Sequence, residues 1–213
     1  MRQANKAIER SHFHIPTVEE VLQYAQGARY FTQIDLKWGY HQVELDPSSR
    51  YITAFIAHCG TYQNKRLLFG AVNAAEDFQR IISQCLLGLK NVINKSDNIL
   101  VFGKTQKEHD DCLEALLERM DECGLTARID KCEFSKEKLE FFGYEISAQG
   151  IRPTEEKKQA LKSCKKPESL KEVQSFLGLA GWVLRKFVPQ YSTIVEPLSS
   201  LAKRGGRWVW TSA

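Results

Sequence analysis

Apolar side chains recur at helical spacing in three segments of the chain. Two of these segments open with the spacing of a capping box, at Thr17 and Thr105, and Asn73 stands at the N-cap position of the third. Each segment carries one apolar stripe opposite a polar face, which is typical of an amphipathic helix packed on a core. The predicted helices cover residues 17–27, 73–89 and 105–124.

Alternating or continuous apolar runs between these helices predict β-strands. The polar tetrad 95–98 separates two such runs and predicts the tight turn of a hairpin, with its side chains at the strand ends. Two helices on one face of an antiparallel sheet form an α+β layer domain, which is the fold class that we expect. The predicted strands cover residues 29–35, 41–45, 51–57, 61–65, 92–94 and 99–102, and a further hairpin covers 139–146.

The composition changes at residues 150–153, where we place a domain boundary. Beyond it, residues 154–164 and 169–187 are predicted to be helical, and Ser169 opens the second helix with another capping box. A less regular helical stretch follows, interrupted by proline and by paired glycines. The sequence therefore predicts two parts, residues 1–150 and 151–213.

The positive charge of the chain is concentrated in the second part. The whole chain has a net charge of +4, but residues 1–150 have a net charge of −3, whereas residues 151–213 carry 12 Lys and Arg against 5 Asp and Glu, a net charge of +7. Such an asymmetry is typical of a protein that grips a polyanion with one part only. A solvated, lysine-rich helix face explains the same numbers, so both interpretations stay open.

Composition excludes several classes of protein. With 43% hydrophobic and 26% charged residues, the chain has the composition of a globular protein. No apolar run approaches the roughly 18 residues that span a bilayer, and the first residues lack the apolar segment of a signal peptide, so we expect an intracellular protein, cytoplasmic or nuclear, with no membrane partner. The six cysteines show neither zinc-ligand spacing nor a disulfide framework, and we expect free thiols.

Two acidic residues could carry chemistry together. Asp35 ends an apolar strand, and Asp97 lies in the predicted turn about sixty residues later. Either residue alone is most simply a turn former or a cap. Antiparallel pairing of the two segments would bring both carboxylates to one sheet edge, and paired hard oxygen ligands are what Mg²⁺ requires. Two such metals can activate a hydroxyl and stabilise a leaving pyrophosphate, as in polymerases and nucleases.

Several linked motifs resemble one family in their order and spacing. The chain resembles the reverse transcriptase of gypsy-type long-terminal-repeat retrotransposons, as part of a Pol polyprotein. The resemblance covers essentially the whole chain. The motifs that carry it are 31–42, 67–70 with 78–79, 97–105, 131–134 with 142–144, and 175–179.

The resemblance implies a fold and a set of site residues. It implies a reverse-transcriptase-like palm with a remnant of the fingers over 1–150, followed by a small, basic helical thumb or connection over 151–213. It implies RNA-directed DNA polymerase activity with two Mg²⁺ ions, a primed RNA or DNA template and deoxynucleoside triphosphates. The implied residues are Asp35 and Asp97 for metal, Tyr40, Phe69 and Gly70 for nucleotide, Phe142, Gly143 and Tyr144 for the primer grip, and Lys157, Lys158, Lys162, Lys165 and Lys166 for nucleic acid.

The chain departs from the family pattern in its candidate site and in its extent. Asn98 stands where the family has a third carboxylate, and Lys95 replaces the apolar residue that opens the motif. Two formal negative charges instead of three, with a cation nearby, predict weaker metal binding. Residues 1–5 resemble the end of a fingers motif, and residues 207–211 resemble the joint before a ribonuclease H domain. We therefore expect a palm and thumb excised from a polyprotein.

Three functional hypotheses remain from the sequence. The first is an active polymerase fragment that uses Asp35 and Asp97. The second is a degenerate or co-opted remnant that binds nucleic acid through its basic part without efficient synthesis. The third is an interaction protein that keeps the fold and has no role with nucleic acid. The sequence leaves template preference and oligomeric state open.

Overall fold

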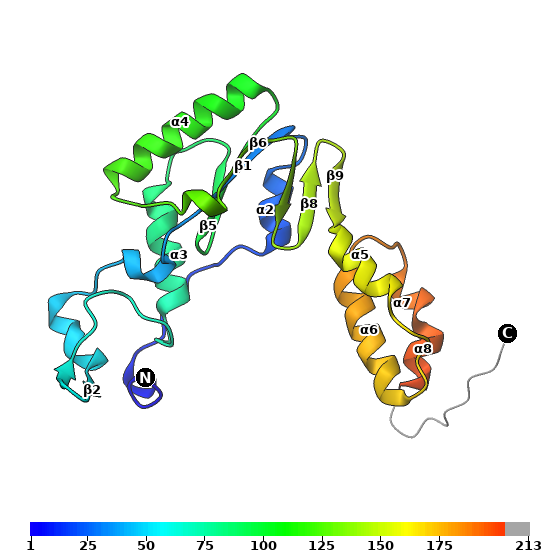
Figure 1. Ribbon diagram of the computed structural model, residues 1–213, viewed down its shortest axis with the longest axis horizontal. Helices are drawn as coiled ribbons and strands as arrows, with labels where there is room; N and C mark the ends of the chain where they lie inside the picture. The colour runs from blue at the N-terminus through cyan, green and yellow to red at the C-terminus, as the bar shows by residue number, and fades with distance from the viewer. Residues whose placement is uncertain (203–213) are drawn as a thin grey trace. The chain divides into compact units, whose positions relative to one another are not determined.

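The computed structural model describes residues 1–202. The chain divides into two compact units (Figure 1). The first comprises Met1–Leu139 and Ile146–Gly150, and the second comprises Glu140–Glu145 and the described residues from Ile151 onward. The segment 207–211, compared above with a ribonuclease H joint, lies outside the described residues.

A four-stranded antiparallel sheet forms the centre of the first unit. Its strand order is β4-β5-β1-β6, so the two inner strands come from segments more than sixty residues apart. The inner pair is in register along the whole of β1, from Tyr30 opposite Gly103 to Asp35 opposite Asn98. The strands are β1 (Tyr30–Asp35), β4 (Val92–Lys95), β5 (Asn98–Gly103) and β6 (Glu133–Lys136).

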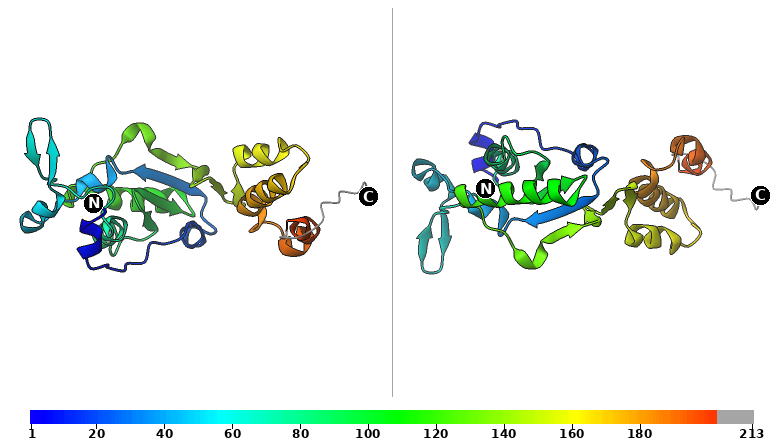
Figure 2. Two further views of the ribbon diagram at one scale, coloured as in Figure 1. Left: turned by 90° about the horizontal axis from the view of Figure 1, so that it is seen from below. Right: turned by 90° about the horizontal axis from the view of Figure 1, so that it is seen from above.

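Two helices cover one face of this sheet, α3 (Ala74–Cys85) and α4 (Gln106–Glu122). Figure 2 shows α4 running along β1, which it contacts together with β5. Ile34 and Ile99 lie opposite each other in the register and point into a core that both helices share. The predicted α+β layer is confirmed. The buried members of this core are Ile34, Leu36, Leu67, Ala74, Phe78, Ile82, Leu86, Ile99, Val101, Leu116 and Met120.

A buried polar network ties α4 to the sheet. The imidazole of His109, which is fully buried, lies 2.8 Å from the Thr32 hydroxyl through Nε2 and 2.9 Å from Asp110 Oδ1 through Nδ1. The same hydroxyl accepts the Ser135 N–H of the edge strand β6 at 3.0 Å. The backbone of α4 approaches β5 so closely that a Cβ at Gly103 would lie 2.6 Å from the backbone nitrogen of His109. Glycine is therefore required there, and one threonine joins three elements.

The chain between β1 and α3 differs most from the sequence prediction. The predicted strand 41–45 is wrong in its first half, because Trp38 and Gly39 adopt positive φ angles of 61° and 44° and turn the chain into the 3-10 helix η1 (Gly39–Gln42). In its second half, Glu44 forms an isolated antiparallel bridge with Arg66. The amide of Gln42 fixes this turn by donating to the carbonyls of Lys37 and Thr126, at 2.7 and 2.9 Å.

The predicted strand pair 51–57 and 61–65 is shorter than expected. Asp46 caps a second 3-10 helix, η2 (Pro47–Thr53), through the Ser48 N–H, and only the short hairpin of β2 (Phe55–Ala57) and β3 (Gly60–Tyr62) remains. Proline at the first turn is preorganised for a helix, which explains the change.

Two further differences concern α3 and β6. Asn73 is the N-cap residue of α3, but its side chain does not cap the helix. It accepts the Ser11 N–H and donates to the Glu9 carbonyl instead, which ties the N-terminal segment to α3. All four residues of β6 are exposed and carry no apolar alternation, so sequence pattern could not predict this edge strand.

The remaining elements of the sheet regions are short. A three-stranded sheet in the order β7-β8-β9 contains the predicted hairpin 139–146, which is confirmed. The helix predicted over 17–27 is present as α2, which begins with a complete capping box. These elements are α1 (Ala4–Ala7), α2 (Val18–Tyr24), η3 (Ile129–Lys131), β7 (Lys138–Phe141), β8 (Tyr144–Ser147) and β9 (Gly150–Pro153).

The second unit is mainly helical, as its sequence pattern predicts. Thr154 and Ser169 cap the two main helices by accepting backbone N–H groups. Among residues 1–202, no helix combines the length and apolar character needed to cross a membrane. The helices are α5 (Glu155–Lys162), α6 (Leu170–Leu184), α7 (Tyr191–Ile194) and α8 (Glu196–Leu201).

Thr32→Val tests the network that joins α4 to the sheet. Valine keeps the shape but leaves His109 Nε2 and the Ser135 N–H without their partner, and an unsatisfied buried polar group costs about 1–3 kcal/mol. We expect a loss of this size in the free energy of unfolding, measured by urea denaturation. Thr61→Val, on the exposed strand β3, is the control and should change stability little. Equal midpoints for both variants would contradict the prediction.

Candidate functional site

Asp35 and Asp97 lie together at one edge of the central sheet. Asp35 ends β1 directly opposite Asn98, the first residue of β5. The next backbone N–H, of Leu36, donates to the Asp97 carbonyl at 2.8 Å. Gly39 closes the site from η1, because a Cβ on it would lie 3.7 Å from the Asp97 Cβ. The structure thus brings together the two carboxylates that the sequence singled out.

A buried glutamine of α3 holds the turn that carries Asp97. Ser96 adopts a positive φ of 53°, and its N–H donates to Gln79 Oε1 at 2.8 Å. The Nε2 group of the same glutamine donates to the Asn94 carbonyl at 3.1 Å, on the preceding strand. Sequence reasoning missed Gln79 as a positioning residue. The available signal was a polar side chain within the apolar stripe of a helix.

The Asn98 amide is committed on both sides. Its Oδ1 accepts the Gln33 Nε2 group at 2.9 Å, and its Nδ2 group donates to Asp97 Oδ1 at 3.2 Å. Gln33 faces the same side of the sheet as Asp35, two positions away on β1. Within residues 1–202, the buried Oε1 of Gln33 has no hydrogen-bond partner. At the position where the resemblance implies a third carboxylate, the chain therefore has an amide that donates a hydrogen bond to the Asp97 carboxylate.

The surroundings of Asp35 disfavour its ionised form. Burial raises the pKa of Asp35, and the nearby Asp97 carboxylate raises it further. The cations Lys131 and Arg128 oppose this shift without cancelling it. Two half-buried carboxylates that repel each other are expected to gain from a bound cation.

Lys95, the cation that stands at the start of the motif, contacts the N-terminal part of the chain. Its ammonium donates to the Pro16 carbonyl at 2.6 Å, and burial lowers its pKa while Glu20 acts in the opposite direction. The fit of the site to a metal therefore depends on the two aspartates and on Asn98. In the described part of the chain, no cluster of three His, Cys, Asp or Glu side chains could hold a metal ion. Two carboxylates fit a hard divalent cation, with one ligand fewer than the resemblance implies.

Aromatic side chains line one side of the carboxylate pair. The Tyr40 ring packs against Phe69 at a centroid distance of 4.8 Å and edge-on against Phe78 of α3 at 5.1 Å. Tyr40 directly follows Gly39, which closes the site, and burial and then the Asp97 charge raise the pKa of Tyr40. Phe69 is 68% exposed, and the following Gly70 adopts a φ of 86°. An exposed ring on a half-buried one forms an open platform.

The second unit contains the residues that resemble a primer grip. Phe142 and Gly143 form the two-residue turn between β7 and β8, with φ angles of 48° and 74°. Positive φ at both positions is the geometry of a type I′ hairpin turn. Phe142 is exposed, whereas Tyr144 is buried. The turn therefore exposes the Phe142 ring, whereas the Tyr144 ring at the start of β8 is buried.

The five candidate lysines are in different environments. Lys157 is buried, with only 9% of its surface exposed. Lys158 forms an ion pair of 2.6 Å with Glu155. The other three, Lys162, Lys165 and Lys166, are exposed.

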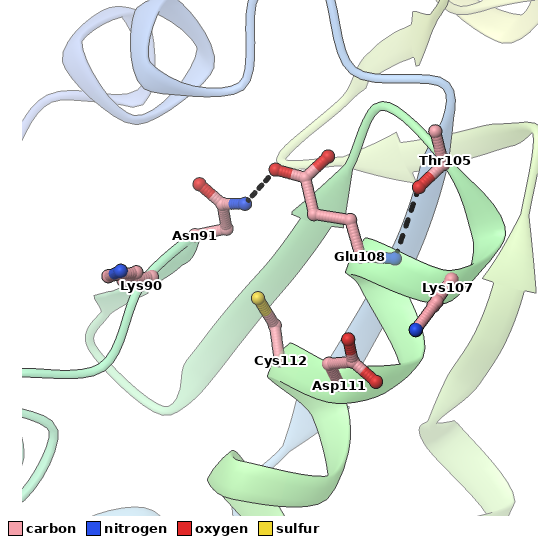
Figure 3. A pocket seen from close by; sticks show the side chains of 7 residues that line it. All are labelled: Lys90, Asn91, Thr105, Lys107, Glu108, Asp111 and Cys112. Carbon is pink, nitrogen blue, oxygen red and sulfur yellow. Dashed lines mark hydrogen bonds between the residues drawn. The ribbon is translucent and has the colours of Figure 1, made fainter.

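A separate pocket of about 670 Å³ contains none of these residues (Figure 3). Asn91 donates to Glu108 across it at 2.8 Å, and the Glu108 N–H donates to the Thr105 hydroxyl at 3.1 Å. The Lys104 N–H and Asn91 lower the pKa of Glu108, so this carboxylate is stabilised by partners within the protein. The lining residues are Lys90, Asn91, Thr105, Lys107, Glu108, Asp111 and Cys112.

Comparison with known proteins shows to which family the chain belongs. The family described as "Reverse transcriptase (RNA-dependent DNA polymerase)" matches residues 1–146. The chain belongs to the reverse transcriptase family. Both the resemblance inferred from the motifs and the expected fold are confirmed.

Relatives of this reverse transcriptase chain are polyproteins. It is 35% identical over 205 residues to the retrovirus-related Pol polyprotein from transposon 297 of Drosophila melanogaster, covering 95% of the chain and 19% of that protein. It is 32% identical over 209 residues to the transposon Tf2-7 polyprotein of Schizosaccharomyces pombe, covering 97% of the chain and 16% of that protein. The chain thus spans less than a fifth of the length of these relatives.

Solved structures agree with the family. The chain is similar to the foamy viral protease-reverse transcriptase in complex with an RNA/DNA hybrid, with a TM-score of 0.81 and 28% identity, covering 99% of this chain and 29% of that chain. The same protein in complex with dsDNA gives a TM-score of 0.85 and 28% identity, covering 99% and 44% of the two chains.

Asp35→Asn tests the electrostatic state of the carboxylate pair. A folded-state pKa above the ordinary 3.8 means that Asp35 contributes stability below pH 3.8, which is lost as pH rises through the folded pKa. Asparagine removes this loss, so we expect the variant to be more stable than the wild type at pH 7, by urea denaturation.

The control for this prediction is Asp130→Asn, whose side chain is 80% exposed, and which should change stability little. A second measurement follows the titration of the Asp35 carboxyl group by carbon-13 NMR. In the Asp97→Asn variant, the pKa of Asp35 should be lower than in the wild type. An unchanged Asp35 titration, or an Asp35→Asn variant less stable at pH 7, would overturn this account.

Proposed function

We propose that this chain is the palm and thumb of an RNA-directed DNA polymerase that adds deoxynucleotides to a primer 3′-hydroxyl on an RNA or DNA template. One observation carries the proposal: in a reverse transcriptase chain, β1 and β5 bring Asp35 and Asp97 to one sheet edge. The similar foamy viral protein has been solved with RNA/DNA hybrid and with dsDNA, which supports a duplex partner.

Asp35 and Asp97 are the residues that would hold divalent metal, for which we propose Mg²⁺. The raised pKa of Asp35 and its repulsion by Asp97 supply the driving force for binding a cation. When bound, the metal supplies a Lewis acid for phosphoryl chemistry. Asn98 lowers the affinity, because its amide donates to Asp97 Oδ1 and adds no negative charge. We therefore propose that this sheet edge binds metal more weakly than a site with the three carboxylates that the resemblance implies.

Tyr40 and Phe69 are the proposed nucleotide contacts, with Gly70 beside them. The Tyr40 ring is held by Phe69 and Phe78, which limits its movement next to the carboxylates. A rigid ring at this place can exclude a 2′-hydroxyl from the incoming sugar, as the family resemblance implies.

We propose that residues 1–150 act as palm with a remnant of the fingers and that residues 151–213 act as thumb. The support is the net charge of +7 on the second part and the exposure of Lys162, Lys165 and Lys166. Phosphate contacts by lysine release counterions, so duplex binding should weaken as salt rises. Phe142 and Gly143, at their exposed turn, are the proposed contacts of the primer end.

A second candidate function is nucleic-acid binding without efficient synthesis. The Asn98 amide favours it, because it occupies one oxygen of Asp97 and replaces a carboxylate. The two functions share the basic unit and differ only at the sheet edge. Activity and metal affinity therefore distinguish them, whereas duplex affinity does not.

Asn98→Asp is the variant that separates the two functions. A carboxylate at this position removes the donor to Asp97 and adds a third negative charge for the metal. We expect the wild type to extend a primer weakly on poly(rA)/oligo(dT) with Mg²⁺ or Mn²⁺. The variant should extend it at least about tenfold faster, since one well-placed charge interaction is worth about 1.4 kcal/mol or more at a reacting phosphate.

Two controls accompany this experiment. Gln26→Glu adds one negative charge at an exposed position and should leave extension unchanged, while Asp97→Asn in the Asn98→Asp background should abolish it. Mn²⁺ affinity, measured by calorimetry, should rise in Asn98→Asp alone. Vigorous synthesis by the wild type would refute the weakened site, and no gain in either measurement for Asn98→Asp would refute the polymerase assignment of this edge.

Lys162→Met tests the proposed thumb. If Lys162 contacts a phosphate, the slope of log affinity for primer–template against log salt should fall by about 0.9 in magnitude. Fluorescence anisotropy at several salt concentrations measures the slope. Lys90→Met, in the pocket of the first unit, is the matched control. An unchanged slope for Lys162→Met would remove this lysine from the interface.

A further inference from the structure

The ammonium of Lys157 lies over two aromatic rings. Its Nζ atom lies 4.2 Å from the ring centroid of Tyr144 on β8 and 4.0 Å from that of Trp182 on α6. Both distances are well within the roughly 6 Å at which a cation is attracted to a ring face. Burial lowers the pKa of Lys157, with Glu140 as the opposing charge. A group in this position is poorly placed to neutralise a phosphate.

The same side chain lies directly on the hairpin turn. A Cβ built on Gly143 would lie 2.8 Å from both Cε and Nζ of Lys157. Gly143 also needs a positive φ of 74°, which L side chains rarely adopt. The backbone angle favours glycine here, and the end of the Lys157 side chain occupies the space that a larger residue would need. The turn and the first helix of the unit are therefore in direct contact.

Tyr144, the first residue of β8 after the turn, is also held by the segment that follows α6. Its hydroxyl accepts a hydrogen bond of 3.1 Å from Lys186, and its ring packs against Phe187 at a centroid distance of 6.1 Å. Tyr144 consequently contacts Lys157 of α5 and two residues of the segment that follows α6. Lys157 is the contact that also reaches Gly143 and Trp182.

We propose that Lys157 is a positioning residue, which locks the turn of Phe142 and Gly143 onto α5 and α6 and makes turn and helices one rigid element. This inference rests on the proposed function, because the turn is assigned there to the primer end. Lys157 acts through the turn and contacts no phosphate. Its charge contributes to the +7 of this part of the chain, but not to the nucleic-acid surface.

Lys157→Met separates positioning from phosphate binding. Methionine keeps the unbranched stem and removes the charge. Losing both ring contacts should weaken binding of a primer–template with a recessed 3′ end by about threefold to tenfold, which is within the range that cation–π contacts contribute. The slope of log affinity against log salt should stay unchanged, because no phosphate contact is lost. Lys162→Met should show the opposite pattern, a reduced slope.

Two measurements test the contact itself without nucleic acid. The ε-methylene protons of Lys157 should resonate upfield of all other lysines in the NMR spectrum, because two ring faces shield them. Gly143→Ala should destabilise the wild type more than it destabilises Lys157→Ala, where the clash with Cε and Nζ is gone. Lys158→Ala, which removes the neighbouring ion pair with Glu155, is the control. In this variant, Gly143→Ala should destabilise the protein as much as it does in the wild type.

The outcomes separate this inference from the function on which it rests. An ordinary lysine resonance, or no coupling between Gly143 and Lys157, overturns the inference even if the chain synthesises DNA. A reduced salt slope in Lys157→Met overturns it as well, because the ammonium would then contact phosphate. If the wild type binds no primer–template, the proposed function fails, and the resonance and the coupling still decide whether Lys157 locks the turn.

Discussion

The register between β1 and β5 is the constraint on which the candidate site depends. It places Asp35 opposite Asn98 and Ile34 opposite Ile99. The same pairing therefore determines both the sheet edge that carries Asp35 and the packed core. A slip by one residue would turn Ile34 outward and move Asp35 to the helix-covered face. Thr32 strengthens this choice, because its hydroxyl joins β1 to α4 and β6. The candidate site is therefore maintained by the interactions that stabilise the central sheet of the first unit.

The sequence predicts this part of the molecule well where local and global preferences agree. Capping boxes and apolar stripes predict the helices, and an apolar strand that ends in Asp35 predicts an edge carboxylate. Prediction failed for 41–45, where the backbone angles of Trp38 and Gly39 override an alternating pattern. It also failed for β6, which has no apolar face to reveal it. Both errors concern segments whose conformation depends on partners distant in sequence.

The hydrogen bonds of the site could not be predicted for a related reason. The roles of Gln33 and Gln79 follow from the register and from the packing of α3 on the sheet, neither of which a residue pattern encodes. The lysines show the same limit. A count of charge treats Lys157 and Lys162 alike, yet one lies between two rings and the other is exposed. Burial converts one of two identical side chains from a surface charge into a structural contact.

Asn98 shows how stability and function oppose each other at this edge. Asp35 is already disfavoured in its ionised form by burial and by Asp97, so a third carboxylate would add repulsion that only a bound cation relieves. The amide instead donates to Asp97 and accepts from Gln33, which stabilises the edge without a metal. The same two hydrogen bonds reduce the charge available to a cation. The hydrogen bonds that stabilise this edge when it is empty would, for the same electrostatic reason, weaken binding of the proposed metal.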